Sequence, residues 1–425
     1  MRVLEVLDTF YPNIDGPINV MVNIAKILNE GKLAEVELLV PNFPKHNVDI
    51  EGIKIHRCTS IPAPEGNRAA MPYANNKVKN LIKNGNFDII HVHSPFTLGK
   101  ASLTYAKKYN IPSMLTIHTR YKTEFERILR SKSLQRFMNK YINKVINLSD
   151  YVLSVSNGAA NQVIEDCDYK KDVYVIRNGT DINPEPISAD KIMKCKKEYD
   201  LKDEFVFLFV GRLVENKNIQ FTLQVLKELK EAGYNDFKFV IVGSGEYLDT
   251  LKEIISEYNL TDNVIFTGKI MDRQKLATIY ACADLFMFPS SADTCGIVAI
   301  EAAANSLPSM MLEDTCASEV IVNGINGFAL PNNPTAWKNK LIEVLNDRNQ
   351  LQDIRDAAKK TVYVSWKTIV EQLYDFYKQA ISNKRNMTIN SQNDVTSNKT
   401  KRTKKLKSKK TKSKSLKSRK NQSEI

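Results

Sequence analysis

Two carboxylates flank the start of an apolar helical pattern in residues 288–301. Asp293 lies before the turn and Glu301 lies inside the predicted helix. The first-turn N–H groups of a helix, together with its dipole, can bind phosphate. The predicted phosphate seat consists of Cys295, Gly296 and Ile297. The carboxylates can accept hydrogen bonds from hydroxyls on either side. This layout suits a diphosphate between two polyols, although an N-capping aspartate and an exposed helical glutamate would give the same pattern.

Two cations follow the strand-like segment 205–210. Arg212 and Lys217 are five residues apart in a loop that opens on Gly211. Arginine can donate two parallel hydrogen bonds to phosphate oxygens and lysine adds a point charge, so the pair can neutralise a departing diphosphate. The competing interpretation is a solvated loop with a surface ion pair to Glu215.

Imidazoles and a glycine follow strand-like segments nearer the start of the chain. His91 and His93 are two residues apart on one predicted strand face, a pattern that is more often structural than metal-binding when no carboxylate or cysteine accompanies it. His118 ends another strand, where it can contact a substrate hydroxyl or simply complete a loop. Gly16, in the loop after the first strand, would let a substrate approach the backbone or serve as an ordinary loop glycine.

These residues depend on two series of short apolar segments separated by helical patterns. The first series is 3–7, 36–40, 53–56, 88–92, 113–117, 151–154 and 173–176, and the second is 205–210, 237–242, 263–267, 285–288, 309–311 and 327–330. Such alternation predicts a doubly wound α/β fold with two Rossmann-like domains in tandem, facing a cleft. Ligands of such sheets bind beyond the carboxyl ends of the strands, where the candidate residues lie.

The positive charge of the 425-residue chain belongs to its end. Residues 384–425 carry a formal net charge of +13, equal to that of the whole chain, so the preceding residues are formally neutral. This Lys-rich segment has too few apolar residues to form a core, and we expect a disordered tail. The six cysteines form no Cys-x-x-Cys pair, which is typical of reduced thiols in a cytosol.

Four motifs in the same order resemble those of the retaining glycosyltransferases of family 4, which have the two-domain GT-B architecture. The motifs are GRLVENKN (211–218), VGSGEY (242–247), IRNGTD (176–181) and Asp293-x7-Glu301, which resembles the family's E-x7-E element. Each motif is weak alone, but their order is specific. The chain departs from the pattern at Asp293, where the family has glutamate, and at Cys295, where it has phenylalanine; both differences bear on the donor sugar.

The resemblance implies a role for each matching position. Arg212 and Lys217 would hold the donor diphosphate, and Glu301 the ribose. Asp293 would bind hexose hydroxyls, with Gly16 and His118 at the transferring sugar. Gly243 would belong to the donor site. The resemblance further implies a nucleotide-sugar donor, an α-linked product with retained configuration, and no cofactor or essential metal. The one Asp-x-Asp, Asp166 to Asp168, follows a helical pattern rather than a buried strand end and is interpreted as a surface turn.

Within the family, residues 91–100 and 116–121 are similar to the diacylglycerol glucosyltransferase branch. This similarity implies transfer of glucose from UDP-glucose to diacylglycerol or a glycosyl-diacylglycerol. Between Lys122 and Asn147, basic and apolar residues alternate so that a helix would have a basic face beside an apolar one, as in an interfacial helix. A helix packed on its own domain would show the same pattern. We expect this region and the 384–425 tail to contact an anionic membrane, without specific nucleic acid.

The predicted organisation has four parts. They are an acceptor-side domain (1–185), a nucleotide-sugar-binding domain (186–362), a helix crossing back toward the first domain (363–383) and the tail (384–425). The chain starts directly on a strand-like segment, and no apolar run approaches the roughly 20 residues of a membrane span. We therefore expect a cytoplasmic protein, peripheral on the inner face of the plasma membrane.

Three other functions are compatible with parts of the sequence. A glycosyltransferase that builds a capsular or other envelope polysaccharide would share every motif. A dinucleotide-dependent oxidoreductase would use Gly243 and Gly245, but position 248 is leucine where a third glycine is needed. A non-catalytic membrane- or nucleic-acid-binding protein would use the tail, and it leaves the motifs unexplained.

Overall fold

The computed structural model describes residues 1–13, 16–63, 66–167 and 169–387. Residues Met1–Leu373, which include two parallel sheets, form one compact unit. We call each sheet with its helices the N-terminal half and the C-terminal half. The predicted tail lies outside the described residues from residue 388 onward.

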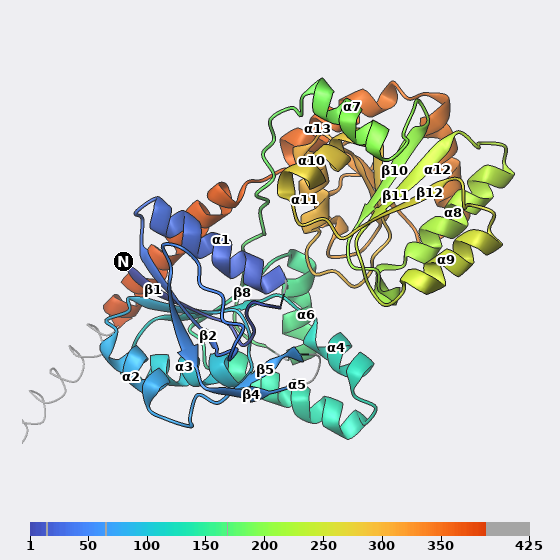
Figure 1. Cartoon of the computed structure of the whole chain (residues 1–425). Coiled ribbons are helices and arrows are strands. Elements are labelled where there is room, and N and C mark those ends of the chain that lie inside the picture. Colours follow the sequence, from blue (N-terminus) through green and yellow to red (C-terminus); the bar gives the residue numbers. More distant parts are fainter. Residues whose placement is uncertain (14–15, 64–65, 168, 388–425) are drawn as a thin grey trace, which may run out of the picture. The chain divides into compact units, whose positions relative to one another are not determined.

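The N-terminal half contains a seven-stranded parallel sheet in the order β3-β2-β1-β6-β7-β8-β9. Its strands are β1 (Arg2–Val6), β2 (Glu35–Pro41), β3 (Lys54–Cys58), β6 (Ile89–Val92), β7 (Ser113–Ile117), β8 (Tyr151–Ser154) and β9 (Val173–Val175). Its helices are α1 (Gly16–Glu30), α2 (Lys77–Asn84), α3 (Thr97–Tyr109), α4 (Tyr121–Ile128), α5 (Lys132–Ile146) and α6 (Asn157–Cys167). In Figure 1, α1 covers one face of the sheet, and α2 and α3 cover the other.

The C-terminal half repeats this design with a six-stranded parallel sheet in the order β12-β11-β10-β13-β14-β15. Its strands are β10 (Phe205–Val210), β11 (Phe237–Val242), β12 (Val264–Gly268), β13 (Leu285–Phe288), β14 (Ser309–Leu312) and β15 (Gly327–Leu330). Its helices are α7 (Ala189–Glu198), α8 (Ile219–Glu231), α9 (Leu248–Glu257), α10 (Arg273–Cys282), α11 (Ile297–Ala304), α12 (Pro334–Asn346) and α13 (Gln350–Thr361). Helices α8, α9 and α12 lie on one face, and α7, α10, α11 and α13 on the other (Figure 1).

The strands form where the sequence is continuously apolar. All six residues of β10 are buried, as expected for a central strand that helices cover on both faces. Each half has its own core, one drawn from residues 4–169 and the other from residues 182–362. The predicted fold class, two Rossmann-like α/β halves of the GT-B type, is confirmed. The predicted domain boundaries stay predictions.

The strand order of each sheet reverses once, at β1 in the N-terminal half and at β10 in the C-terminal half. We call these two places the first (N-terminal) and second (C-terminal) switch points. The chain runs from β1 outward to β3, then crosses to β6 on the other side of β1. In the same way, β10 lies between β11 and β13. The carboxyl ends of two such strands diverge into loops on opposite faces, which leaves a crevice where ligands bind.

Two local features differ from the sequence-based predictions. A short antiparallel pair, β4 (Ser60–Pro62) and β5 (Arg68–Ala70), was not predicted. The region from Lys122 to Asn147 is not one helix but two, α4 and α5, because the chain turns at residues 129–131 and the Ser131 hydroxyl caps α5 by accepting a bond from Leu134 N–H. Residues 366–387 are helical, close to the predicted 363–383.

Candidate active site

Lys217 and Asp293 meet at the carboxyl ends of β10 and β13. Lys217 Nζ lies 2.6 Å from Asp293 Oδ1 and 2.8 Å from Oδ2. The same ammonium lies 5.5 Å from the centre of the Phe288 ring, the last residue of β13. The two side chains that the resemblance assigns to the diphosphate and to the hexose are therefore together, and in this structure each neutralises the other.

Arg212 is the second predicted phosphate ligand, and its side chain differs from that of Lys217 in exposure and in bonding. The residue is exposed at the end of the turn that follows β10. Among the residues that the structure describes, its guanidinium has neither an ion pair nor a hydrogen bond. The full positive charge of Arg212 is therefore available to a ligand at this switch point.

Gly243 shapes this turn by backbone packing. Its φ is +148°, and a Cβ at this position would lie 1.9 Å from the carbonyl oxygen of Gly211. Gly211 N–H in turn donates to Val242 O at 3.0 Å. Gly243 thus lets the loop after β11 lie directly against the turn that carries Arg212, and a larger residue would displace that turn.

The predicted phosphate seat lies at the start of α11. Gly296 precedes the helix, and a Cβ there would lie 2.7 Å from Ala317 O, so the close packing requires glycine. One N–H group of this predicted phosphate-binding site is already used within the chain, because Ile297 N–H donates to Cys295 O at 3.0 Å. Burial raises the pKa of the Cys295 thiol to about 11, so at neutral pH it is a neutral group and not a nucleophile.

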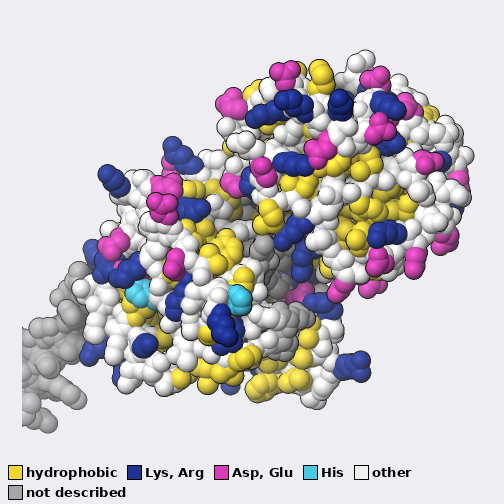
Figure 2. All heavy atoms as spheres, viewed as in Figure 1, with side chains coloured by type: hydrophobic (Ala, Val, Ile, Leu, Met, Phe, Trp, Pro, Cys, Tyr) yellow, Lys and Arg dark blue, Asp and Glu magenta, His cyan; other side chains and the backbone are white. Residues whose placement is uncertain are grey.

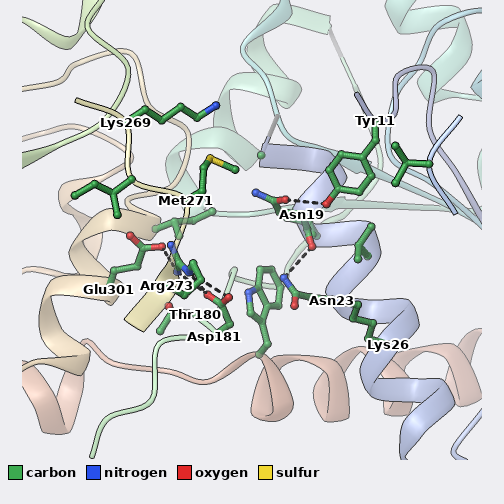
Figure 3. Close-up of a pocket in the computed structure, with 18 of the residues that line it drawn as sticks. Tyr11, Asn19, Asn23, Lys26, Thr180, Asp181, Lys269, Met271, Arg273 and Glu301 are labelled. Carbon is green, nitrogen blue, oxygen red and sulfur yellow. Dashed lines mark hydrogen bonds and ion pairs between the residues drawn. The ribbon is translucent and has the colours of Figure 1, made fainter. Parts of the chain in front are cut away.

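Glu301, one helical turn further along α11, is almost fully buried and holds two donors. Its Oε1 accepts from Arg273 at 2.6 Å and its Oε2 from the Tyr280 hydroxyl at 3.0 Å. Arg273 also donates to Asp181 Oδ1 through Nε at 3.0 Å. Burial, then the charge of Glu301, raises the pKa of Tyr280 well above 10, which keeps its hydroxyl a donor. Figure 3 shows Glu301 and Asp181 both directed at Arg273.

A cavity of about 590 Å³ opens beside Glu301, Arg273 and Asp181 (Figure 3). Its wall includes Gly16 and Glu301, which the sequence assigned to one donor, together with Asp181, Arg273 and Ile297. Further lining residues are Tyr11, Asn19, Asn23, Lys26, Lys269, Met271 and Trp366. A Cβ at Gly16 would meet no atom within 4 Å, so packing does not require glycine there.

His118, the last predicted catalytic residue, is the partly exposed end of a hydrogen-bonded chain whose other members are buried. Its Nε2 lies 2.9 Å from His93 Nδ1, and His93 Nε2 lies 2.6 Å from Glu5 Oε2. His91 Nδ1 is 3.3 Å from the same carboxylate oxygen. The interpretation of His91 and His93 as a histidine pair without a carboxylate was therefore wrong, because Glu5 on the adjacent strand accompanies both.

Sequence reasoning missed Glu5, Arg273 and Tyr280. A signal existed for Glu5, since a charged residue inside the apolar segment 3–7 must find a buried partner. Arg273 and Tyr280 gave no signal, because a polar residue on a helix is ordinary. Asp166 forms an ion pair with Lys122 at 3.0 Å, and Asp168 is outside the described residues.

Comparison with known proteins agrees with the motifs and the fold. The family described as Glycosyltransferase Family 4 matches residues 14–183, and the family described as Glycosyl transferases group 1 matches residues 192–361. Together the two matches span both halves. The chain belongs to glycosyltransferase family 4.

Relatives of this family-4 glycosyltransferase extend along nearly its whole length. An uncharacterized glycosyltransferase of Methanocaldococcus jannaschii is 28% identical over 90% of this chain and 99% of its own. The alpha-monoglucosyldiacylglycerol synthase of Streptococcus pneumoniae is 25% identical over 90% of this chain and 86% of its own. The crystal structure of Anabaena HepE in complex with UDP has a TM-score of 0.72 at 18% identity, covering 89% of this chain and all of that one, which supports the GT-B fold.

The family-4 enzyme has groups suited to its reaction class at both switch points. The C-terminal half presents cations and carboxylates, and the N-terminal half presents an imidazole.

Among the described residues, no helix combines the length and apolar character that crossing a membrane requires.

Proposed function

We propose that this glycosyltransferase moves glucose from UDP-glucose to a membrane lipid, diacylglycerol or a glycosyl-diacylglycerol, with retention of configuration and an α-linked product. The observation that carries the proposal is the meeting of Lys217 and Asp293 at one switch point, where the same loop carries Arg212, whose guanidinium has no partner among the described residues. The similarity to the alpha-monoglucosyldiacylglycerol synthase of Streptococcus pneumoniae supports the choice of donor and acceptor.

The two cations bind the diphosphate of the donor in this proposal. Arg212 offers a guanidinium that no residue in the described ranges binds, whereas Lys217 must be shared with Asp293. When a diphosphate approaches, Lys217 gains a second anionic partner and Asp293 is freed to accept hydrogen bonds from hexose hydroxyls. As the bond to the sugar breaks, negative charge grows on the leaving diphosphate and both cations stabilise it.

The same charges make a metal unnecessary. Two fixed cations supply the positive charge that a divalent ion provides in other transferases. We propose that the enzyme needs no essential metal and no cofactor, with the nucleotide sugar as a substrate.

Glu301 binds the ribose of the donor in the proposal. Both its oxygens already accept hydrogen bonds, from Arg273 and Tyr280, so the carboxylate is held rigidly at the wall of the cavity. A carboxylate oxygen has more than one acceptor position, which leaves room for ribose hydroxyls. Gly16 on the same wall allows the transferring sugar to approach closely, and His118 contacts one of its hydroxyls.

Helices α4 and α5 form a membrane-facing surface in this proposal. Three apolar side chains are unusually exposed there: Ile128 is 61% exposed, Leu134 44% and Phe137 62%. Basic side chains lie among them, namely Arg127, Arg130, Lys132, Arg136 and Lys140. Figure 2 shows hydrophobic side chains beside Lys and Arg in this region, which Figure 1 locates by the α4 and α5 labels. Apolar groups ringed by basic ones suit the interface of an anionic bilayer.

The Lys-rich end of the chain supplies a second membrane contact. Its +13 charge lies in residues 384–425, most of which fall outside the described residues. Each basic residue near an anionic surface contributes about 1 kcal/mol, screened by salt. We therefore place the enzyme peripherally on the inner face of the plasma membrane. A chain cut before Lys384 should bind anionic vesicles more weakly than the full chain at low salt, with equal donor binding.

The deciding experiment incubates the purified full-length enzyme with a panel of nucleotide sugars and extracted membrane lipids. A new hexosyl-lipid found by mass spectrometry only with UDP-glucose, and an α signal in its proton spectrum, is the expected result. Arg212→Ala is the matched control, and a chelator should leave the yield unchanged. Transfer only to polyprenyl-linked or polysaccharide acceptors would reject the lipid acceptor in favour of an envelope glycan.

A further inference from the structure

Four polar side chains form a continuous hydrogen-bonded chain beneath the N-terminal switch point. Glu5 is the next-to-last residue of β1 and lies directly beside His91 on β6, and His93 is the first residue after β6. All three are buried, with relative exposures of 0% for Glu5 and 1% for each histidine. His118 follows β7, the next strand, and is partly exposed. The chain therefore runs from the core outward to His118.

The hydrogen bonds allow one arrangement of protons at neutral pH. An ionised carboxylate can only accept, so His93 Nε2 must carry a proton and donate it to Glu5 across 2.6 Å. The other nitrogen of a neutral imidazole is bare, so His93 Nδ1 must accept. The atom across that 2.9 Å contact is His118 Nε2, which must therefore be the donor.

His91 completes the arrangement on the other side. Its Nδ1 faces Glu5 at 3.3 Å, and its Nε2 lies 2.7 Å from the hydroxyl of Thr116, a group that can donate to a bare nitrogen. His91 thus helps to stabilise the Glu5 carboxylate without touching His118 in this chain of bonds.

The ionisation of these groups agrees with this assignment. Burial alone would raise the pKa of Glu5, but attraction to His91 and hydrogen bonds from both imidazoles hold it below its usual range. Burial, then the proximity of His91, lowers the pKa of His93 to about 4. Burial also lowers the pKa of His118 well below its usual value. The Glu5 carboxylate is therefore ionised, and the His93 and His118 rings are neutral, at pH 7.

We propose that Glu5 and His93 are positioning residues that hold His118 in the tautomer protonated on Nε2, so that His118 Nδ1 accepts a hydrogen bond from a hydroxyl of the transferring sugar. The role of the sugar hydroxyl rests on the proposed function, whereas the tautomer does not. His118 is the residue that touches substrate, and the other two act through it. A fixed lone pair on His118 Nδ1 favours a ligand group that donates a hydrogen bond, such as a hydroxyl, over a group that can only accept one.

A metal centre of Glu5, His91 and His93 is the competing use of these groups. Ligand atoms on a tetrahedral zinc ion with bonds of about 2.0 Å lie about 3.3 Å apart. Glu5 Oε2 and His93 Nε2 are only 2.6 Å apart, which is a hydrogen-bond distance and leaves no position for an ion between them. Since His93 uses its other nitrogen for His118, the geometry favours the hydrogen-bonded chain.

Nitrogen NMR of the full-length enzyme labelled with 15N-histidine tests the proposal directly. The chain has five histidines, so the imidazole spectrum is simple, and loss of one set of signals in His118→Ala assigns that residue. We expect Nε2 of His118 to be protonated and Nδ1 bare at pH 7, with a scalar coupling across the hydrogen bond to His93. A proton on Nδ1, a doubly protonated ring, or stoichiometric zinc in the purified protein would overturn the proposal.

Variants of His93 separate positioning from simple structural support. In His93→Leu the coupling disappears and His118 loses its fixed tautomer, whereas His93→Gln supplies an N–H for Glu5 and a carbonyl for His118 and should restore it. His91→Gln is the matched control, since it alters a Glu5 partner and should leave His118 unchanged. If His93→Leu does not fold, the His93→Gln spectrum alone decides: a mixed His118 tautomer there contradicts the proposal.

Activity gives an independent second readout. Loss of one neutral hydrogen bond costs up to about tenfold, so His93→Leu should lower kcat up to tenfold with little change in KM for the donor, and His93→Gln should recover most of it. Equal loss in both variants would reject positioning through His118. A correct tautomer in an enzyme that glycosylates no lipid would reject only the proposed function.

Discussion

The two switch points of this glycosyltransferase use polar groups in opposite ways. At the first, Glu5, His91 and His93 are fully buried, and a single carboxylate charge is held by imidazole donors. At the second, Lys217 and Asp293 form an ion pair whose side chains are 16% and 21% exposed, beside the exposed Arg212. The same position in the same fold thus holds a locked hydrogen-bonded network in one half and an exchangeable charge cluster in the other.

The physical reason for the difference is solvation. A charge that is removed from water must be fully paired, so the buried network has one proton arrangement and resists change. A partly exposed ion pair keeps part of its hydration, so it can exchange one partner for a ligand at lower cost than a fully buried group. A fixed network suits the recognition of a neutral hydroxyl, and an exchangeable pair suits the binding and release of a diphosphate.

The largest effect should follow loss of a cation at the second switch point. Arg212→Ala and Lys217→Ala should each lower turnover by a hundredfold or more, about 3 kcal/mol, because in the proposed function each charge stabilises the leaving diphosphate. Arg212→Ala is the cleaner test, since no described partner is left unpaired. Steady-state transfer rates and circular dichroism measure the effect and the fold.

The matched control for these cations is Lys252→Ala, which removes a cation from the surface of α9. It should transfer at the normal rate. Near-normal turnover in both Arg212→Ala and Lys217→Ala would mean that the second switch point does not bind the diphosphate.

The buried network should make the protein sensitive to acid. The pKa of His93 is about 4 in the folded protein against 6.5 for a free histidine, so the unfolded chain takes up the proton first as the pH falls. The stabilisation is therefore complete above pH 6.5 and is lost between 6.5 and 4, by on the order of 3 kcal/mol. The measurement is the free energy of unfolding in urea at a series of pH values.

His93→Gln should remove this part of the pH dependence, because glutamine does not titrate. His46→Gln, at an exposed position, controls for replacing a histidine and should keep the wild-type slope. If the free energy of unfolding depends on pH equally in His93→Gln and in the wild type, the pKa of His93 is not lowered in the folded state.

The contrast between the halves also explains what the sequence could reveal. The strands are continuous apolar segments, so the sheets and the residues that follow their ends were predictable from local pattern. Glu5 and His93 are 88 positions apart, and Lys217 and Asp293 are 76 apart. The motifs placed the second pair at one site by family resemblance, but only the folded chain shows that its members bind each other. For Glu5 no motif existed, and its partners depend on strand order.

Helix α5, at the surface, shows the same limit of prediction from local sequence pattern. The basic and apolar pattern from Lys122 to Asn147 was visible in the sequence, but the break at Ser131 was not, because a serine inside such a pattern can equally lie on a helix face. What the sequence could not decide was which apolar residues pack inward. Ile142, Val145 and Ile146 do, and Phe137 does not.

The two carboxylates of the second switch point should respond differently to neutralisation. Glu301→Gln should weaken UDP binding about tenfold, since the carboxylate that we propose binds the ribose would lose its charge-assisted bonds. Asp293→Asn should instead leave UDP binding equal or slightly tighter, because Lys217 is freed for the diphosphate, while turnover falls. Calorimetric titration of UDP and steady-state rates distinguish the two.

Tyr280→Phe is the matched control for Glu301→Gln, since it removes one donor and keeps the carboxylate. Its UDP affinity should fall by less than that of Glu301→Gln. Weaker UDP binding in Asp293→Asn would contradict the exchange of partners by Lys217 and would indicate that the ion pair supports the loop instead.

The smallest effect should come from the surface of α5. Phe137→Ser removes the most exposed apolar side chain of that helix, and partial burial of an aromatic ring in an interface contributes about 1 kcal/mol, or roughly fivefold in binding. Met193→Ser is the matched control, because Met193 on α7 is 67% exposed in the other half. Vesicle flotation of both variants at high salt, where the basic groups are screened, isolates the apolar contribution. Equal binding of Phe137→Ser and Met193→Ser would mean that α5 does not enter the bilayer, and that the membrane contact of this enzyme is electrostatic alone.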